Sequence, residues 1–167
     1  QSYLSEDFYG NKPAKGSWQS VPDLEEYYDT GTFLTDALTK EAIKTIEKPI
    51  NDKQPFYLNM AHYAIHDPIM ADPRYHQKYV DAGLDPIEAK YASLIEGMDT
   101  SLGDIMDYLV SNKADKNTII IFMSDNGGLS TIPPRGGKEN TQKLPLKTGK
   151  SSVNEGGIRE TMIVKWP

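Results

Sequence analysis

The sequence predicts an α/β fold with a mainly parallel sheet, and three segments support this prediction. Residues 56–60 form a short apolar run after a proline, as is typical of a buried strand. A long amphipathic helix is predicted over residues 86–110, and a β-branched run at residues 118–124 follows it. Because a crossover helix makes the strands that it connects parallel, we expect their carboxyl ends at one edge of the sheet.

The first third of the chain predicts one helix. Residues 1–31 show no sustained period, and their glycine and aromatic content predicts irregular surface structure. Residues 35–47 predict an amphipathic helix with Thr35 or Thr39 available as its cap, ended by Pro49. Its apolar residues recur at helical spacing: Leu38, Ala42, Ile43 and Ile46.

The long helix has the clearest start signal. Asp85 supplies an N-cap and Pro86 a first-turn proline. Residues 129–152 are rich in Gly, Pro, Lys and Thr and predict a long loop, which in a compact domain is usually functional or disordered. The long helix carries one apolar stripe, predicted to be core: Tyr91, Leu94, Ile95, Met98, Leu102, Ile105, Met106 and Leu109.

Composition excludes several classes of site. The 167 residues are 38% hydrophobic, which suits one domain with a sizeable core. The net charge of −6 argues against non-specific nucleic-acid binding. Without cysteine, the chain has no disulfide, thiolate metal site or cysteine nucleophile. Its apolar runs are too short to span a bilayer. The apolar run at residues 161–164 has no closing element after it, so we expect a fragment.

Two interpretations of Asp125 and Asn126 remain open. Both residues directly follow the predicted strand. Ligands of open α/β sheets bind at this end of the strands, and the side-chain oxygens of the two residues suit calcium or magnesium. Gly127 and Gly128 allow the backbone to turn sharply beside a ligand. The alternative is a plain hairpin turn, which Asn-Gly favours. A hairpin needs a second strand at once, and residues 129–140 suit one poorly.

His66 and Lys150 are the other candidate site residues. His66 lies in a loop after the first predicted strand, where a histidine can donate a proton near neutral pH, whereas His62 and His76 are expected to be structural. Lys150 could hold an anionic oxygen or be a solvated loop lysine. A phosphate-binding P-loop is rejected because Leu144 stands where that motif requires glycine.

Four motifs stand out in the sequence: AHYAIHDP, KYASLIEGMDTSLGDIMDYL, TIIIFMSDNGG and GKSSVNEGGIRETMIVKWP. Together they resemble the second half of the catalytic domain of the type I, formylglycine-dependent sulfatases, which include the arylsulfatases. The resemblance covers residues 33–167 and implies an alkaline-phosphatase-like α/β sandwich, present here as a fragment. The family's nucleophile-bearing half and its small carboxyl-terminal domain are expected to lie outside residues 1–167.

The resemblance also implies roles for the site residues. Asp125 and Asn126 match the second pair of ligands of a single divalent cation, calcium, and Lys150 matches the sulfate-binding lysine. His66 matches the histidine of the His-x-Pro motif, a candidate general acid. Residues 155–159 look like scaffold. The formylglycine nucleophile is expected upstream, because the TIPPR segment at residues 131–135 has threonine in the nucleophile position and follows the SDNGG strand, the wrong order for the family.

The implied function is hydrolysis of a sulfate monoester of an aryl or sugar substrate, by a sulfuric ester hydrolase of which this chain is an inactive part. The expected partners are a sulfated small molecule or glycan and the missing amino-terminal half, with no nucleic acid and no membrane span. The family suggests a periplasmic, secreted or lysosomal location. Two alternatives stay open: a two-metal phosphatase or phosphodiesterase of the same superfamily, for which Asn126 is an unsuitable zinc ligand, and a non-catalytic module that binds sulfated glycans.

Overall fold

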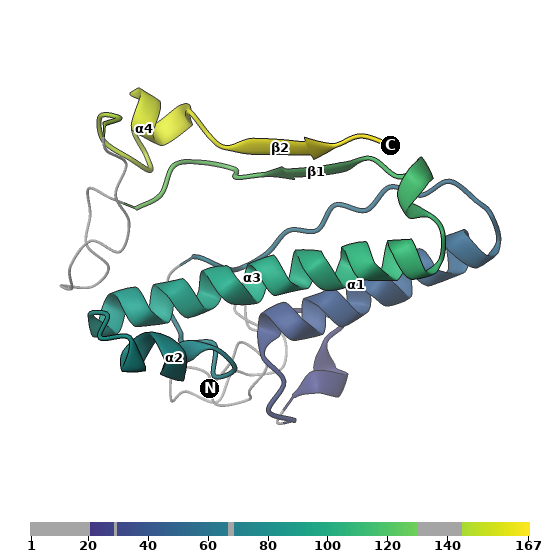
Figure 1. The fold of residues 1–167 in the computed structure, drawn as a ribbon, viewed down its shortest axis with the longest axis horizontal. Helices are drawn as coiled ribbons and strands as arrows, with labels where there is room; N and C mark the ends of the chain where they lie inside the picture. The colour runs from purple at the N-terminus through teal and green to yellow at the C-terminus, as the bar shows by residue number, and fades with distance from the viewer. Residues whose placement is uncertain (1–20, 29, 67–68, 130–144) are drawn as a thin grey trace.

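A computed structural model describes residues 21–28, 30–66, 69–129 and 145–167. Helices form one layer, and a ribbon of two strands runs beside it (Figure 1). Within the described ranges, no helix combines the length and apolar character needed to cross a membrane. The elements in order are η2 (Glu25–Tyr27), α1 (Leu34–Asn51), α2 (His76–Asp81), α3 (Pro86–Ser111), η3 (Asp115–Asn117), β1 (Ile120–Met123), α4 (Glu155–Ile158) and β2 (Met162–Lys165).

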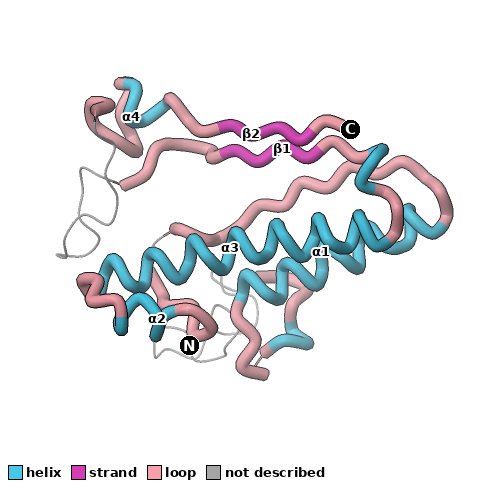
Figure 2. The backbone as a smooth tube through the Cα atoms, viewed as in Figure 1, coloured by secondary structure: helices cyan, strands magenta, loops and turns pink. Residues whose placement is uncertain are grey.

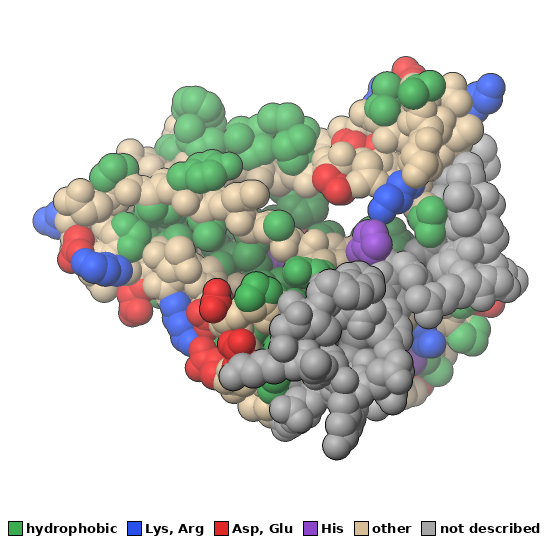
Figure 3. Space-filling model, turned by 180° about the vertical axis from the view of Figure 1, so that it is seen from behind, with side chains coloured by type: hydrophobic (Ala, Val, Ile, Leu, Met, Phe, Trp, Pro, Cys, Tyr) green, Lys and Arg blue, Asp and Glu red, His purple; other side chains and the backbone are tan. Residues whose placement is uncertain are grey.

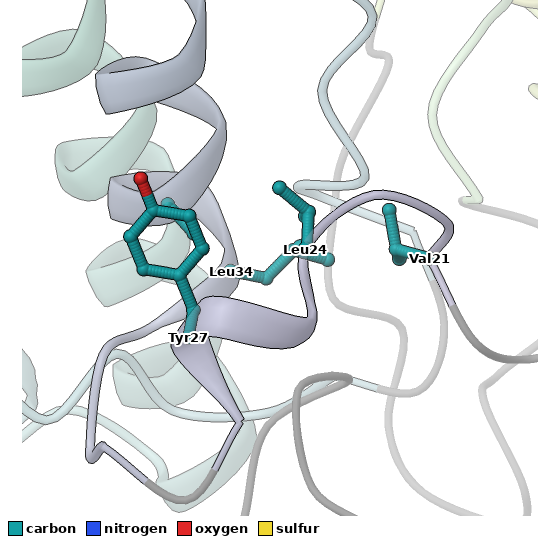
Figure 4. Packing of buried hydrophobic residues seen from close by; sticks show 5 residues of the cluster. Val21, Leu24, Tyr27 and Leu34 are labelled. Carbon is teal, nitrogen blue, oxygen red and sulfur yellow. The ribbon is translucent and has the colours of Figure 1, made fainter. Parts of the chain in front are cut away.

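The segment before α1 is part of the core, not irregular surface structure as the sequence predicted. Val21, Leu24 and Tyr27 are buried and pack with Leu34 and Ala37 at the start of α1 (Figure 4). Apolar residues in an aperiodic segment carry no pattern that distinguishes a buried face from an exposed one. Residues 1–20 lie outside the described part of the chain.

The predicted helix forms α1, but both of its predicted ends are wrong. Phe33 occupies the N-cap position without a side-chain hydrogen bond, so neither predicted threonine is the cap. Thr39 is buried instead, and its hydroxyl donates to the Thr35 carbonyl (2.6 Å) and pairs with Ser101 of α3 (2.5 Å). The helix continues through Pro49, because a proline in the last turn removes only one backbone hydrogen bond.

The N-cap predicted for α3 is confirmed, whereas its buried face differs from the predicted stripe. The Asp85 side chain accepts from the Ile87 amide (3.0 Å), and Pro86 occupies the first turn. The stripe is mostly half-buried, and Ile95 is exposed. Small side chains allow the close approach of α1 and α2, a packing role that an apolar pattern does not reveal. The buried residues are Ala89, Ser93, Leu94, Gly97, Ser101 and Leu109.

The strand predicted at residues 56–60 is wrong as an element, although its burial alternates with the period of a strand. Figure 2 shows this segment as loop, and no strand of the described part pairs with it. This segment and β1 run in the same direction in Figure 1. Helix α3 lies between them in the sequence and runs in the opposite direction. A strand forms only when a neighbour accepts its backbone hydrogen bonds, which the local sequence cannot supply.

The described sheet consists of β1 and β2, which are antiparallel, with Ile120 opposite Lys165 and Met123 opposite Met162. The mainly parallel sheet that the sequence predicts is therefore absent from these residues. Hydrophobic side chains gather over the strands in Figure 3 and are exposed on both faces of the pair. The exposed residues are Ile121, Met123, Met162, Ile163 and Val164.

Two substitutions in α3 test its close packing. Ser101→Leu is expected to lower the free energy of unfolding by about 1–3 kcal/mol, because the larger side chain has no room beside Thr39. Gly103→Ala is the control: a Cβ there meets nothing within 4 Å, so the higher helix propensity of alanine should raise stability by about 0.5–1 kcal/mol. Thermal denaturation measures both. Equal stability of the two variants would contradict the assigned packing.

Candidate functional site

The SDNGG segment forms a bend directly after β1. Asp125 is exposed and Asn126 is half-buried. The Ser124 hydroxyl donates to the Asn126 carbonyl (2.9 Å), which closes the bend. The strand that pairs with β1 begins only at Met162, so the bend is not the tight hairpin turn that Asn-Gly could have formed.

Backbone contacts join this bend to the segment that carries Lys150. The Gly127 amide donates to the Gly157 carbonyl (3.1 Å), and the Lys150 amide donates to the Gly128 carbonyl (2.9 Å). A Cβ on Gly127 would lie 2.1 Å from the Gly156 carbonyl oxygen, far inside van der Waals contact. Glycine is therefore required here for close backbone approach.

The four-residue helix α4 packs in the same way against the loop before it. The Gly156 amide donates to the Lys147 carbonyl (3.0 Å). A Cβ on Gly156 would lie 2.1 Å from the Thr148 carbonyl oxygen, and one on Gly157 would lie 2.1 Å from the Ser152 carbonyl oxygen. The bend after β1, residues 147–152 and α4 thus form one closely packed unit, which we call the glycine knot.

The loop of the glycine knot contains backbone conformations that L-residues adopt rarely. Thr148 has φ +63° and Ser151 has φ +71°, on either side of Lys150. A β-branched residue with positive φ is strained and persists only where its surroundings hold it in place. The contact of the Thr148 carbonyl with Gly156 supplies that restraint.

The knot brings together three of the four predicted site residues. Asp125 and Asn126 lie on the bend whose Gly128 carbonyl accepts from the Lys150 amide, and Lys150 is half-buried. His66 lies on another loop, where its amide donates to the Tyr63 carbonyl (2.9 Å) and its side chain is exposed. That loop follows the extended segment, which ends on the side of the molecule where α4 lies (Figure 1).

Figure 3 shows the molecule from behind, with an opening between the strand pair and the helical layer. A histidine and a basic side chain lie next to each other at its edge. Side chains of these types at one opening suit an anionic ligand. The TIPPR segment at residues 131–135, which the sequence order excludes as the nucleophile motif, lies outside the described part of the chain.

His62 has a different environment from His66. Its side chain is largely buried, and burial lowers the pKa of its imidazole because charging it there costs solvation. Its Nδ1 is buried, and no partner for this atom lies among the described residues. His62 is therefore held in the neutral state over more of the pH range than an exposed histidine.

The donor set of the bend suits a hard divalent cation. The Asp125 carboxylate and the Asn126 amide oxygen are ligands that calcium prefers, and calcium takes 6–8 oxygens. The described ranges hold no cluster of three or more His, Asp or Glu residues suited to a metal ion. A calcium ion held by Asp125 and Asn126 would need further oxygen ligands. Cysteine, the ligand of thiolate zinc sites, does not occur in the chain.

The sequence signals did not show what holds the candidate site residues in place. The two glycines of the bend were expected to permit a turn, and residues 155–159 to be scaffold. The structure assigns Gly127, Gly156 and Gly157 to direct contacts between backbones. Paired glycines on both segments were the available signal, but sequence alone does not show which backbones meet.

Comparisons with known proteins agree with this architecture. A family model described as Sulfatase matches residues 2–167, more than the 33–167 expected. N-acetylgalactosamine-6-sulfatase of Mus musculus is 31% identical over 162 residues, and a sulfatase of Formosa agariphila is 33% identical over 149 residues. The alignments cover 94% and 83% of this chain, but 29% and 26% of the relatives. This chain thus spans less than a third of their length.

A solved structure is also similar in fold. The crystal structure of Ps i-CgsB in complex with k-i-k-neocarrahexaose has a TM-score of 0.72 and 34% sequence identity. The match covers 81% of this chain and 28% of that chain. The helical layer and the strand pair therefore recur together in a larger protein.

Substitution of Gly156 tests the glycine knot. Gly156→Ala is expected to lower the free energy of unfolding by about 1–3 kcal/mol or more, because the added Cβ meets the rigid Thr148 carbonyl. Ile158→Ala is the control on the same helix: its side chain is exposed, so we expect a change within about 0.5 kcal/mol. Differential scanning calorimetry measures both. An unchanged melting temperature for Gly156→Ala would show that the close contact is absent.

Proposed function

This chain belongs to the sulfatase family, and from this membership we propose that the full-length protein is a sulfuric ester hydrolase that cleaves a sulfated glycan. The chain has the alkaline-phosphatase-like α/β fold of its sulfatase neighbours. Residues 1–167 contribute part of the active site, and the formylglycine nucleophile and the remaining metal ligands come from elsewhere in the protein. Residues 1–167 alone are then inactive.

The observation that carries this proposal is the hydrogen bond from the Lys150 amide to the Gly128 carbonyl. It joins the backbone of Lys150 to the bend that carries two oxygen donors, Asp125 and Asn126. Lys150 would bind a sulfate oxygen, and Asp125 and Asn126 would hold calcium. Bound calcium supplies positive charge that lowers the energy of negative charge on the sulfate ester.

His66 would complete the polar groups on the leaving-group side. Cleavage of a sulfate monoester places negative charge on the departing oxygen, and a proton donor stabilises that charge. An exposed imidazole on a loop can approach a substrate, unlike the buried imidazole of His62. We assign His66 to the donation of a proton to the ester oxygen.

A sulfated glycan is the substrate class that the relatives favour. One relative is named N-acetylgalactosamine-6-sulfatase, and the structural neighbour Ps i-CgsB is in complex with k-i-k-neocarrahexaose. The family match favours a sulfatase over the two-metal phosphatase alternative. The non-catalytic glycan-binding alternative would give binding without release of sulfate.

The exposed faces of the strand pair support the assignment of this chain to a larger catalytic domain. Apolar side chains on both faces of a sheet are typical of strands that are covered on both sides. In the described part, one helical layer lies beside the pair (Figure 1). We infer that other parts of the same protein cover the remaining apolar surface. The relatives are more than twice as long as this chain.

Release of sulfate by the full-length protein tests the role of Lys150. Lys150→Ala is expected to lower kcat/KM for a sulfated sugar by about 10²–10³-fold, because it removes the positive charge that we assign to binding a sulfate oxygen. Lys147→Ala is the control on the same loop, since its side chain is exposed, and it should retain activity. Full activity of Lys150→Ala would contradict the site. Binding of sulfated sugar without release of sulfate by the unaltered protein would favour the non-catalytic alternative.

Calcium titration of the full-length protein tests the role of Asp125. Asp125→Ala is expected to weaken calcium binding by about 10-fold or more, because the site loses a charged ligand. Asp115→Ala is the control, since this aspartate lies in η3, before β1, and outside the glycine knot. Isothermal titration calorimetry measures both affinities. Equal calcium affinity in the two variants would contradict the assignment of Asp125.

A further inference from the structure

The extended segment that leads to His66 has one exposed face. Burial alternates along residues 56–63, as expected for extended backbone whose side chains point to opposite sides in turn. The exposed face carries a tyrosine near each end: Tyr57 is 91% exposed and Tyr63 is 43% exposed. At about 3.3 Å per residue, the two tyrosines lie about 20 Å apart. Tyr63 is the one at the His66 end of the segment.

A turn joins Tyr63 directly to His66. The His66 amide donates to the Tyr63 carbonyl (2.9 Å), so the two residues are the first and last of a four-residue turn. The Cα atoms at the ends of such a turn lie within about 7 Å of each other. Ala64 and Ile65, between them, are half-buried, whereas the side chains of Tyr63 and His66 are both exposed. This turn with His66 distinguishes Tyr63 from other exposed aromatic residues of the chain.

The role assigned to His66 places the substrate sugar beside this turn. His66 is assigned to protonate the ester oxygen, and in a sugar sulfate that oxygen is attached to the sugar. The sugar ring then lies within a few bonds of the imidazole. Lys150, Asp125 and Asn126 are assigned to the sulfate group and the cation that binds it. These roles account for recognition of the sulfate group but not of the sugar.

We propose that Tyr63 is a specificity-determining residue whose ring stacks on the sugar that carries the sulfate group. The proposal rests on the proposed function, because it requires His66 at the ester oxygen. A sugar ring presents C–H groups on its faces, and the electron-rich face of an aromatic ring attracts such groups. Tyrosine offers a large contact area and has only two side-chain torsions to restrain, so little conformational entropy is lost on binding.

The test measures sulfate release by the full-length protein. The probes are N-acetylgalactosamine 6-sulfate and k-i-k-neocarrahexaose, the carbohydrates named for two similar proteins, and the one that is cleaved faster is used. Tyr63→Ala is expected to raise KM by about 10-fold and to leave kcat within about 2-fold, because stacking is equally strong before and during the reaction. Inhibition by inorganic sulfate should not change, since this anion has no sugar ring. An unchanged KM would show that Tyr63 does not bind the sugar.

Tyr63→Phe separates the ring from its hydroxyl group. This variant keeps the aromatic face, so its KM should stay within about 2-fold of the value for the unaltered protein. If Tyr63→Phe raises KM as much as Tyr63→Ala does, the hydroxyl group and not the ring binds the sugar, and the proposal is overturned.

Tyr57→Ala is the matched control, because it removes the same side chain from the same face of the segment about 20 Å away. We expect its KM to stay within about 2-fold of the value for the unaltered protein. An equal rise of KM in Tyr57→Ala would assign the effect to loosening of the segment and overturn the proposal. Thermal denaturation gives a second measurement. If Tyr63→Ala lowers the melting temperature and leaves KM unchanged, the ring packs against another part of the protein and does not bind the sugar.

His66→Ala separates failure of this proposal from failure of the proposed function. It is expected to lower kcat by about 10²-fold or more, whereas Tyr63→Ala changes KM. An unchanged kcat in His66→Ala would show that the proton-donor role is wrong, and the reason for placing the sugar beside the turn would be lost with it. A lower kcat in His66→Ala together with an unchanged KM in Tyr63→Ala would show that only the stacking role is wrong.

Discussion

Contact between backbones at Gly127, Gly156 and Gly157 is the constraint on which the candidate site depends. Side chains adjust to one another by rotation, but carbonyl groups that meet Cα atoms leave no such freedom. The segment after β1 and the segment before β2 are therefore held at a fixed distance from each other. The Lys150 amide can therefore reach the Gly128 carbonyl, on the bend that carries Asp125 and Asn126.

Helix α3 gives the rest of the molecule a comparable constraint through its small residues. Ser93, Gly97 and Ser101 lie on one face and admit a carboxylate at one point and a hydroxyl pair at another. Polar groups buried in this way need specific partners, so they fix one alignment of the helices more strictly than an apolar interface does. Residues 72–75 are bound to this face, and the bend with Asp125 is part of the glycine knot.

The sequence predicted those features that depend on local chemistry. Asp85 and Pro86 predicted the start of α3, because a cap and a first-turn proline act within a few residues. The oxygen ligands expected at the bend also rest on local residue types, and their role stays a prediction. Residues 56–60 were predicted as a strand, and this was wrong for the described chain, because a strand depends on a partner elsewhere. The burial of Val21, Leu24 and Asp72 also depends on contacts outside their own segments.

The pairing of β1 with β2 has a consequence for the order of folding. Met123 lies opposite Met162, so residues 124–161 form the loop that this pairing closes. Closing a loop of that length costs entropy before any contact is gained, whereas α1 and α3 form from contacts near in sequence. We expect the helices to form first and the glycine knot to assemble late. The candidate site residues Asp125, Asn126 and Lys150 are then among the last to reach their positions as the chain folds.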